Sequence, residues 1–278
     1  MLLSLHPSAF SKELPTPKIA APLQIRQGDV IYFTVRIANG AASVEGRFRN
    51  RTIPFFQTPT PGEFGALIGV DLADPPIREE LRVKASASGG LLEERRYVIK
   101  VLPVQFAKQE LTVPNNFVDL DPETVKRAEE EQKEILQSLG RVTPRKFWEA
   151  PFVIPVEGKI SGSFGLRRVY NGEPRSPHSG EDINAPRGTD VRATNEGVVA
   201  LVGDFFFSGK SVVLDHGLGL YSMYFHLDDV NVTEGERVHK GAVIGKLGAT
   251  GRATGPHLHW GTRLNGARVN PMSILKIP

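Results

Sequence analysis

Short runs in which apolar and polar residues alternate dominate the first hundred residues of the chain. Alternation of this kind is typical of strands with one buried face, and turn residues such as Asn39-Gly40 and Gly89-Gly90 separate the runs. Five clear runs and two weaker ones are present, at 30–37, 44–48, 65–72, 81–88, 95–102, 23–26 and 52–56. About seven short strands at this spacing predict an Ig-like β-sandwich over residues 23–105, after an N-terminal extension at 1–22. This predicted domain has no cluster of His, Asp or Glu residues. We therefore consider three roles for it: a spacer, a binding module or a lid.

A helical pattern follows, within a connector predicted at residues 106–150. Asp121 can cap the helix, Pro122 suits its first turn and Gly140 marks its end, so we expect a helix at about 121–139. Its narrow apolar stripe consists of Val125, Ala128, Ile135, Leu136 and Leu139. The acidic run EEEQKE within it is interpreted as a solvated face rather than a metal site.

The remaining residues, 151–278, are rich in glycine and in short alternating runs, which predicts a second, almost wholly antiparallel β domain. The run at 256–264 is predicted to be a strand, and the Asn-Gly pair after it is a strong two-residue hairpin signal. His257 and His259 therefore share one face of this strand, while Trp260 faces the other.

A second pair of candidate ligands, His178 and Asp182, lies about eighty residues upstream. Gly180 between them permits a close backbone approach or a positive φ, and it argues against a helical ligand arrangement. A catalytic zinc usually takes three protein ligands and keeps its fourth position for water. His178, Asp182 and one member of the His257/His259 pair supply that number, although each histidine alone is more often a surface or core residue.

The composition of the chain limits its possible domain organisation and function. The 278 residues suffice for two domains with cores of their own. A net charge of +3 without a Lys/Arg run does not indicate nucleic-acid binding. The absence of cysteine excludes disulfides and thiolate zinc ligands. No apolar run is long enough for a transmembrane segment, and the start MLLSLHPSAF is too short and lacks the basic region of an intact signal peptide.

The stretch from about Ile160 to Pro271 resembles the LytM/lysostaphin-type zinc metalloendopeptidases, which cut peptide bonds in bacterial peptidoglycan. The matching segments are SGSFGLR (161–167), HSGEDINAPRGTDVRA (178–193), GVV (197–199), VVLDHGLGLYSMYFHL (212–227), VTEGERVHKGAVIGKLGATGRATGPHLHWG (232–261) and VNP (269–271). They follow the family order and cover most of the last 120 residues, so the resemblance is specific.

The resemblance implies a site. By position, His178, Asp182 and His259 are the ligands of one Zn²⁺ per chain, and His226 and His257 are the catalytic histidines. Zinc lowers the pKa of its bound water to about 7. The motif segments offer no obvious glutamate as a base, but imidazole titrates near operating pH. The sequence leaves open which histidine is the base and which stabilises the oxyanion.

Several neighbouring residues are interpreted as non-ligands. His216 is expected to form structural hydrogen bonds, and His239 and His6 to be solvated. Glu181 is expected to face away from the metal. We consider two roles for Tyr170 and Arg167: they line the cleft, or they pack within the domain.

The sequence therefore predicts a zinc endopeptidase acting on peptidoglycan stem peptides or cross-bridges. The alternatives are a latent enzyme, whose N-terminal region or connector blocks the cleft, and a non-enzymatic LytM-like activator of other cell-wall hydrolases. The substrate implies a periplasmic or extracellular location, with an export signal that was removed or lies outside this chain. Other cell-envelope proteins are considered as partners of the N-terminal domain. Which peptide bond is cut stays open.

Overall fold

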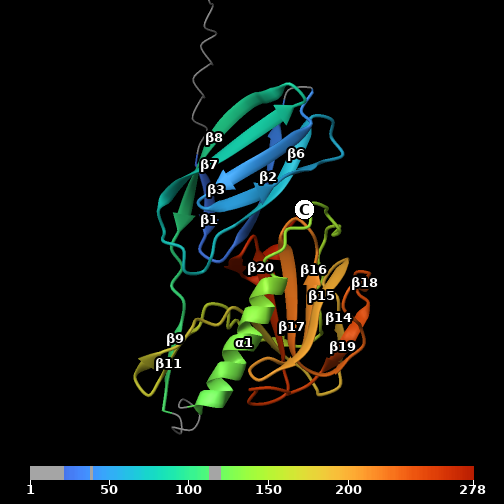
Figure 1. Cartoon of the computed structure of the whole chain (residues 1–278). Coiled ribbons are helices and arrows are strands. Elements are labelled where there is room, and N and C mark those ends of the chain that lie inside the picture. The colour runs from blue at the N-terminus through green and yellow to red at the C-terminus, as the bar shows by residue number, and fades with distance from the viewer. Residues whose placement is uncertain (1–21, 38–39, 113–119) are drawn as a thin grey trace, which may run out of the picture.

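The computed structural model describes residues 22–37, 40–112 and 120–278 and is mainly β, as predicted (Figure 1). His6 and Asn39 lie outside the described residues. None of the helices in these ranges has both the length and the apolar character needed to cross a bilayer.

Two sheets form the N-terminal part and share one core. The five-stranded sheet has the order β1-β8-β7-β3-β4, with bounds β1 (Leu23–Arg26), β8 (Gly90–Leu102), β7 (Arg78–Ala87), β3 (Ser43–Phe48) and β4 (Arg51–Pro54). The second sheet has the order β2-β6-β5, with bounds β2 (Val30–Arg36), β6 (Glu63–Gly69) and β5 (Phe56–Gln57). Phe48 and Leu81 of the first sheet pack with Phe33 and Ile68 of the second. All seven predicted runs contribute strands.

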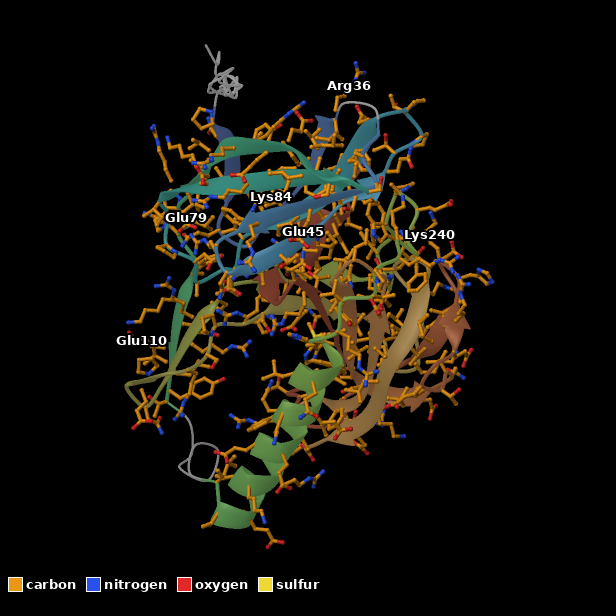
Figure 2. The ribbon with its side chains drawn as sticks, turned by 45° about the horizontal axis from the view of Figure 1, so that its top comes forward. Arg36, Glu45, Glu79, Lys84, Glu110 and Lys240 are labelled. Carbon is orange, nitrogen blue, oxygen red and sulfur yellow. The ribbon has the colours of Figure 1, made fainter. Side chains whose placement is uncertain are left out.

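The outer face of the five-stranded sheet is charged because its strands alternate. In β3 every second residue is buried, and the exposed Glu45 lies opposite the exposed Lys84 of β7. Figure 2 shows both side chains on this sheet.

The connector contains an unpredicted strand as well as the predicted helix. β9 (Lys108–Leu111) pairs in parallel with β11 (Arg167–Tyr170), which also pairs with β12 (Glu173–Pro174). All four residues of β9 are exposed, so the strand has no apolar alternation to reveal it. The helix α1 spans Pro122–Ser138, and the Asp121 carboxylate accepts hydrogen bonds from two N–H groups of its first turn. The cap and both helix limits agree with the prediction.

A ten-stranded sheet forms the C-terminal part, and all its pairings are antiparallel, as expected. Its main order is β10-β13-β20-β17-β16-β15-β18. The strands are β10 (Lys159–Ile160), β13 (Gly180–Asn184), β14 (Asp190–Arg192), β15 (Gly197–Phe205), β16 (Gly209–Asp215), β17 (Leu220–Val230), β18 (Arg237–Val238), β19 (Val243–Leu247), β20 (Leu258–Leu264) and β21 (Ala267–Val269), followed by the short helix α2 (Pro271–Ile274).

The two faces of this sheet are covered differently. Tyr224 and Trp260 point into the main core, whereas Tyr221 and Met223 point to the face on which Leu139, just after α1, packs. Figure 1 shows α1 lying across this second face. The connector helix therefore covers part of the face that also carries the candidate ligands.

The two halves of the molecule are in direct contact. Asp71, which follows β6, accepts hydrogen bonds from the backbone N–H of Arg268 at 2.7 Å and from its Nε and Nη2 at 3.0 and 2.7 Å. Val30 and Leu67 of the small N-terminal sheet belong to the core cluster of the C-terminal sheet. Buried apolar contacts and the salt bridge between Asp71 and Arg268 thus join the two parts.

Candidate metal centre and groove

Two of the three candidate ligands lie on neighbouring strands. Asp182 of β13 and His259 of β20 are direct partners in an antiparallel pairing, so both side chains lie on the same face. His259 Nδ1 lies 3.1 Å from Asp182 Oδ1. His178 precedes β13, and its Nε2 lies 3.1 Å from Asp182 Oδ1 and 2.9 Å from His259 Nδ1. In the described part of the chain this is the one cluster of His, Cys, Asp or Glu with metal-binding geometry.

The donor set and its dimensions fit zinc. Ligand bonds of about 2.0–2.1 Å in a tetrahedron place the ligand atoms about 3.3 Å apart. The separations of 2.9 to 3.1 Å are close to that spacing. Burial raises the pKa of the Asp182 carboxyl, but the two imidazoles beside it outweigh burial and hold its pKa well below the usual range. The carboxylate is therefore charged, as a metal ligand must be.

A loop before the metal centre orients His178. Its Nδ1 donates to the Ser163 carbonyl at 3.0 Å, which leaves Nε2 free to bind a metal. The Ser163 hydroxyl accepts a hydrogen bond from the Asp182 N–H at 3.2 Å. Sequence reasoning assigned no role to Ser163, although it lies in the matching segment SGSFGLR.

Glu181 faces away from the ligands, as predicted, but it supports them indirectly. It is buried, and its carboxylate accepts hydrogen bonds from the N–H groups of Ser163 at 2.9 Å and Phe164 at 3.3 Å. Burial raises the pKa of Glu181. The side chain thereby fixes the backbone whose carbonyl orients His178, a role that sequence reasoning missed.

Position 180 requires a glycine because neighbouring atoms leave no room for a side chain, and not because its φ is positive. A Cβ at this position would lie 2.6 Å from the Trp260 carbonyl oxygen and 2.7 Å from His259 Nε2. Trp260 is fully buried on the opposite face of β20, as alternation predicted. The hairpin that follows has φ values of 49° at Asn265 and 82° at Gly266, in agreement with the Asn-Gly signal.

The two predicted catalytic histidines lie beside the candidate ligands, and both rings have the same tautomer. Nδ1 of His226 lies 2.9 Å from the Thr250 carbonyl, and Nδ1 of His257 lies 2.8 Å from the Gly255 carbonyl. Because a carbonyl only accepts hydrogen bonds, Nδ1 carries the proton and Nε2 of the neutral ring holds a lone pair. The ring centroids of His226 and His257 are 4.8 Å apart.

The backbone places His226 in an unusual conformation. Its φ of 65° is in the left-handed region, which is uncommon for a residue with a side chain. Its N–H donates to the Ser208 carbonyl at 2.8 Å, and this backbone hydrogen bond holds the residue in place. Burial, together with the neighbouring His259, lowers the pKa of His226 to about 4, so the ring is neutral at pH 7.

The other histidines lie apart from this centre. His216 is fully buried, with Nδ1 2.6 Å from the Glu196 carbonyl and Nε2 2.7 Å from the Ser222 hydroxyl. It has the hydrogen-bonding role expected from the sequence. His239 is exposed, with 88% of its side-chain surface accessible, which agrees with the prediction that it is solvated.

The side chains of the three candidate ligands open into a cavity of about 460 Å³. Tyr170 lines it, whereas Arg167 is exposed and the neighbouring Arg168 lines the wall instead. Gln109 and Leu111 of the unpredicted strand β9 form part of the same wall. The connector therefore contributes directly to the cavity.

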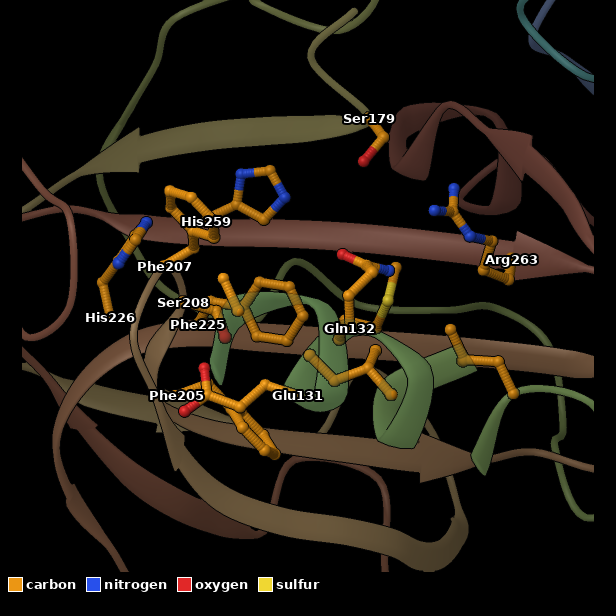
Figure 3. A pocket seen from close by; sticks show the side chains of 14 residues that line it. Glu131, Gln132, Ser179, Phe205, Phe207, Ser208, Phe225, His226, His259 and Arg263 are labelled. Atoms are coloured by element: carbon orange, nitrogen blue, oxygen red, sulfur yellow. The ribbon is translucent and has the colours of Figure 1, made fainter. Parts of the chain in front are cut away.

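A second pocket of about 220 Å³ continues from His226 and His259 beneath α1. Figure 3 shows Glu131 and Gln132 of the helix on one side of it and Arg263 of β20 at the end away from the histidines. Glu131 is the exception in the acidic run, whose other residues are exposed as expected. Its side chain is only 16% exposed and accepts a hydrogen bond from the Phe206 N–H at 2.6 Å, because the helix packs against the sheet.

Comparisons with known proteins agree with this geometry. The model of peptidase family M23 matches residues 176–271. A crystal structure of a Pseudomonas aeruginosa protein assigned to peptidase M23 superposes with a TM-score of 0.70 and 31% identity, covering 92% of this chain and 96% of that one.

Two curated relatives have stated activities. The DD-carboxypeptidase/endopeptidase Mpg of Neisseria meningitidis is 42% identical over 116 residues, which are 42% of this chain and 27% of that protein. The peptidoglycan DD-endopeptidase ShyA of Vibrio cholerae is 40% identical over 121 residues, 42% of this chain and 28% of that protein. The matches thus span little more than a quarter of the length of these curated relatives.

Proposed function

Since the chain belongs to peptidase family M23, we propose that it is a zinc-dependent endopeptidase that hydrolyses peptide bonds in bacterial peptidoglycan. The observation that carries this proposal is the convergence of His178 Nε2, Asp182 Oδ1 and His259 Nδ1 at the edge of a cavity, beside two further histidines. The peptidoglycan endopeptidase activity stated for the Vibrio cholerae relative supports the substrate class.

The proposal assigns one Zn²⁺ per chain to His178, Asp182 and His259. When bound, zinc supplies a Lewis acid that makes water nucleophilic near neutral pH. The protein's own contribution is orientation. The Ser163 carbonyl holds the His178 ring with Nε2 toward the other two ligands, and Gly180 lets the His259 ring lie against the backbone of β13.

His226 and His257 are assigned the proton transfers. Hydrolysis requires that the attacking water loses a proton and that the departing amine nitrogen gains one as the C–N bond breaks. Both rings donate through Nδ1 to backbone carbonyls, so each can accept a proton at Nε2 and release it to the amine. The protonated ring next to the scissile carbonyl also stabilises the negative charge that develops on its oxygen.

Digestion of purified sacculi tests the proposal. We expect new free amino groups, identified by mass spectrometry of the released fragments, without new reducing sugar ends. A chelator should abolish the activity and added zinc should restore it. Reducing ends that rise together with solubilisation would instead indicate cleavage of glycosidic bonds, which normally requires a pair of carboxylic acids.

The domain organisation is part of the same proposal. We assign residues 1–22 to an extension, 23–105 to an Ig-like sandwich, 106–150 to the connector and 151–278 to the peptidase domain. Two sheets around one core support the Ig-like assignment. The substrate implies a periplasmic or extracellular location, where other envelope proteins are candidate partners of the sandwich.

Latency is the second candidate, because the connector borders the site. Gln109 and Leu111 of β9 line the cavity that holds the ligands, and Gln132 of α1 lines the pocket next to it. Limited proteolysis within 106–150 should then raise the activity on sacculi. Equal activity of the intact and the cleaved chain would speak against latency. The complete set of ligands and flanking histidines disfavours a purely non-enzymatic activator.

A further inference from the structure

Arg263 lies on the same face of β20 as the ligand His259. Residues at positions i, i+2 and i+4 of a strand share a face, so His259, Gly261 and Arg263 lie on one face of β20, and His259 and Arg263 line the pocket beneath α1. Gly261 itself has no side chain, and Met223 of β17 packs over it and lines the same pocket. In Figure 3, His226 and His259 lie at one end of this pocket and Arg263 lies at the other. Four residues of strand correspond to about 13 Å.

The guanidinium of Arg263 has no partner of opposite charge in hydrogen-bond range among the described residues. Within 22–37, 40–112 and 120–278 it forms no ion pair, and its buried Nη1 has no hydrogen-bond partner. Burial and the nearby Arg268 lower its pKa to about 10, so it remains a cation at neutral pH. Arg263 is only partly buried, but an unpaired cation removed in part from water still costs free energy, which a ligand of opposite charge offsets.

The carboxylates near Arg263 are already bound to other groups. Asp71 accepts hydrogen bonds from the backbone and the guanidinium of Arg268. Glu131, which lines the pocket, accepts hydrogen bonds from the Phe206 N–H and from Arg127 Nε, both at 2.6 Å. The described residues therefore leave the pocket with a cation that neither of these carboxylates pairs with.

We propose that Arg263 binds a carboxylate of the peptide substrate in the pocket beneath α1, about 13 Å along β20 from His259. This inference rests on the proposed function and narrows its substrate class. A guanidinium can bind a carboxylate through two parallel hydrogen bonds. Peptidoglycan stem peptides carry free carboxylates, whereas oligoglycine cross-bridges are neutral. The pocket beneath α1 thus favours acidic stem peptides, and Arg263 is a specificity residue rather than a catalytic one.

The test compares matched ligands that differ only in charge. For binding, calorimetry measures the Kd of an uncross-linked stem tetrapeptide and of the same peptide with its carboxylates converted to carboxamides. For cleavage, kcat and KM are measured with the corresponding cross-linked dimers. The proteins are the wild type, Arg263→Gln, Arg263→Lys and the control Arg47→Gln, which removes an exposed arginine of β3.

We expect the wild type to bind the carboxylate peptide about ten- to a hundred-fold more tightly than the carboxamide, as is usual for a charge-assisted hydrogen bond. Arg263→Gln should reduce this ratio to near one, mainly through KM, with little change for the carboxamide. Arg263→Lys should retain part of the preference. Arg47→Gln should behave as the wild type, which excludes a general effect of net charge.

Two results would overturn the proposal. One is equal binding of both peptides by the wild type, a measurement that does not depend on the folding of any variant. The other is an equal loss for both peptides in Arg263→Gln, which would indicate a structural role. If the wild type cleaves neither dimer, the proposed function fails, while the ratio of the two Kd values still decides the role of Arg263.

Discussion

Asp182 and His259 lie directly opposite each other across β13 and β20, with Oδ1 and Nδ1 3.1 Å apart. They are 77 residues apart in the sequence, so the strand register alone brings them together. The next pair in this register joins Glu181 to Trp260, both buried on the other face. A slip of one residue would therefore exchange a candidate metal ligand for a side chain that faces away.

Metal content tests the ligand assignment. His178→Ala, Asp182→Ala and His259→Ala each remove one donor from a three-donor site, so each variant should lose most of the single zinc that the wild type contains. Elemental analysis of the purified proteins measures this. His239→Ala, which changes an exposed histidine, should keep about one equivalent. Full retention of zinc in all three ligand variants would refute the assignment.

Loss of activity without loss of metal should identify the proton-transfer residues. His226→Ala and His257→Ala should keep much of their zinc and lose activity about a hundred- to ten-thousand-fold, the usual contribution of general acid–base groups. Release of amino groups from sacculi and elemental analysis of the same samples provide both readouts. If His257→Ala empties the site while His259→Ala leaves it filled, the roles of these two histidines are reversed.

Removal of the Glu181 carboxylate should weaken metal binding from the opposite face of β13. Glu181→Ala leaves the N–H groups of Ser163 and Phe164 without their acceptor, so the loop that orients His178 loosens. We expect zinc affinity to fall about ten- to a hundred-fold, as for other residues that orient a ligand. Competition with a chelator measures the affinity. Glu173→Ala, at an exposed site, is the control, and unchanged affinity in Glu181→Ala would contradict the prediction.

The contact between Asp71 and Arg268 should make stability depend on pH. Burial raises the pKa of Asp71, but the hydrogen bonds from Arg268 and Ala73 outweigh it and hold the pKa below the ordinary value of 3.8. The stabilisation is therefore complete above about pH 4, near the unfolded pKa, and is lost as the pH falls through the lower folded pKa.

Asp71→Asn should accordingly lower the free energy of unfolding at pH 7 by about 1–3 kcal/mol. Urea unfolding at pH 7 and near pH 3 measures the difference from the wild type, which should shrink at the lower pH. Asp204→Asn, at an exposed position, should have little effect at either pH. A difference for Asp71→Asn that stays constant with pH would show that the carboxylate charge is not the cause.

Local features of the chain were predictable from the sequence because they depend on residues close to one another. The alternation in β3, the Asp121 cap of α1 and the Asn265-Gly266 turn all agree with the structure. Each is an effect of backbone conformation or side-chain period within a few residues. The motif spacing also indicated His178, Asp182 and one member of the His257/His259 pair, and the family resemblance selected His259; the structure brings these three residues together.

Contacts between distant segments were decided only by the tertiary structure. The strand β9 has no apolar pattern of its own and forms by pairing with β11. Glu131 belongs to a run that looks solvated, yet the packing of α1 against the sheet brings it to the Phe206 N–H. Among the described residues, the guanidinium of Arg263 has no ion-pair partner, because the nearby Asp71 is bound to Arg268. Such properties depend on which surfaces meet, and a one-dimensional pattern does not contain that information.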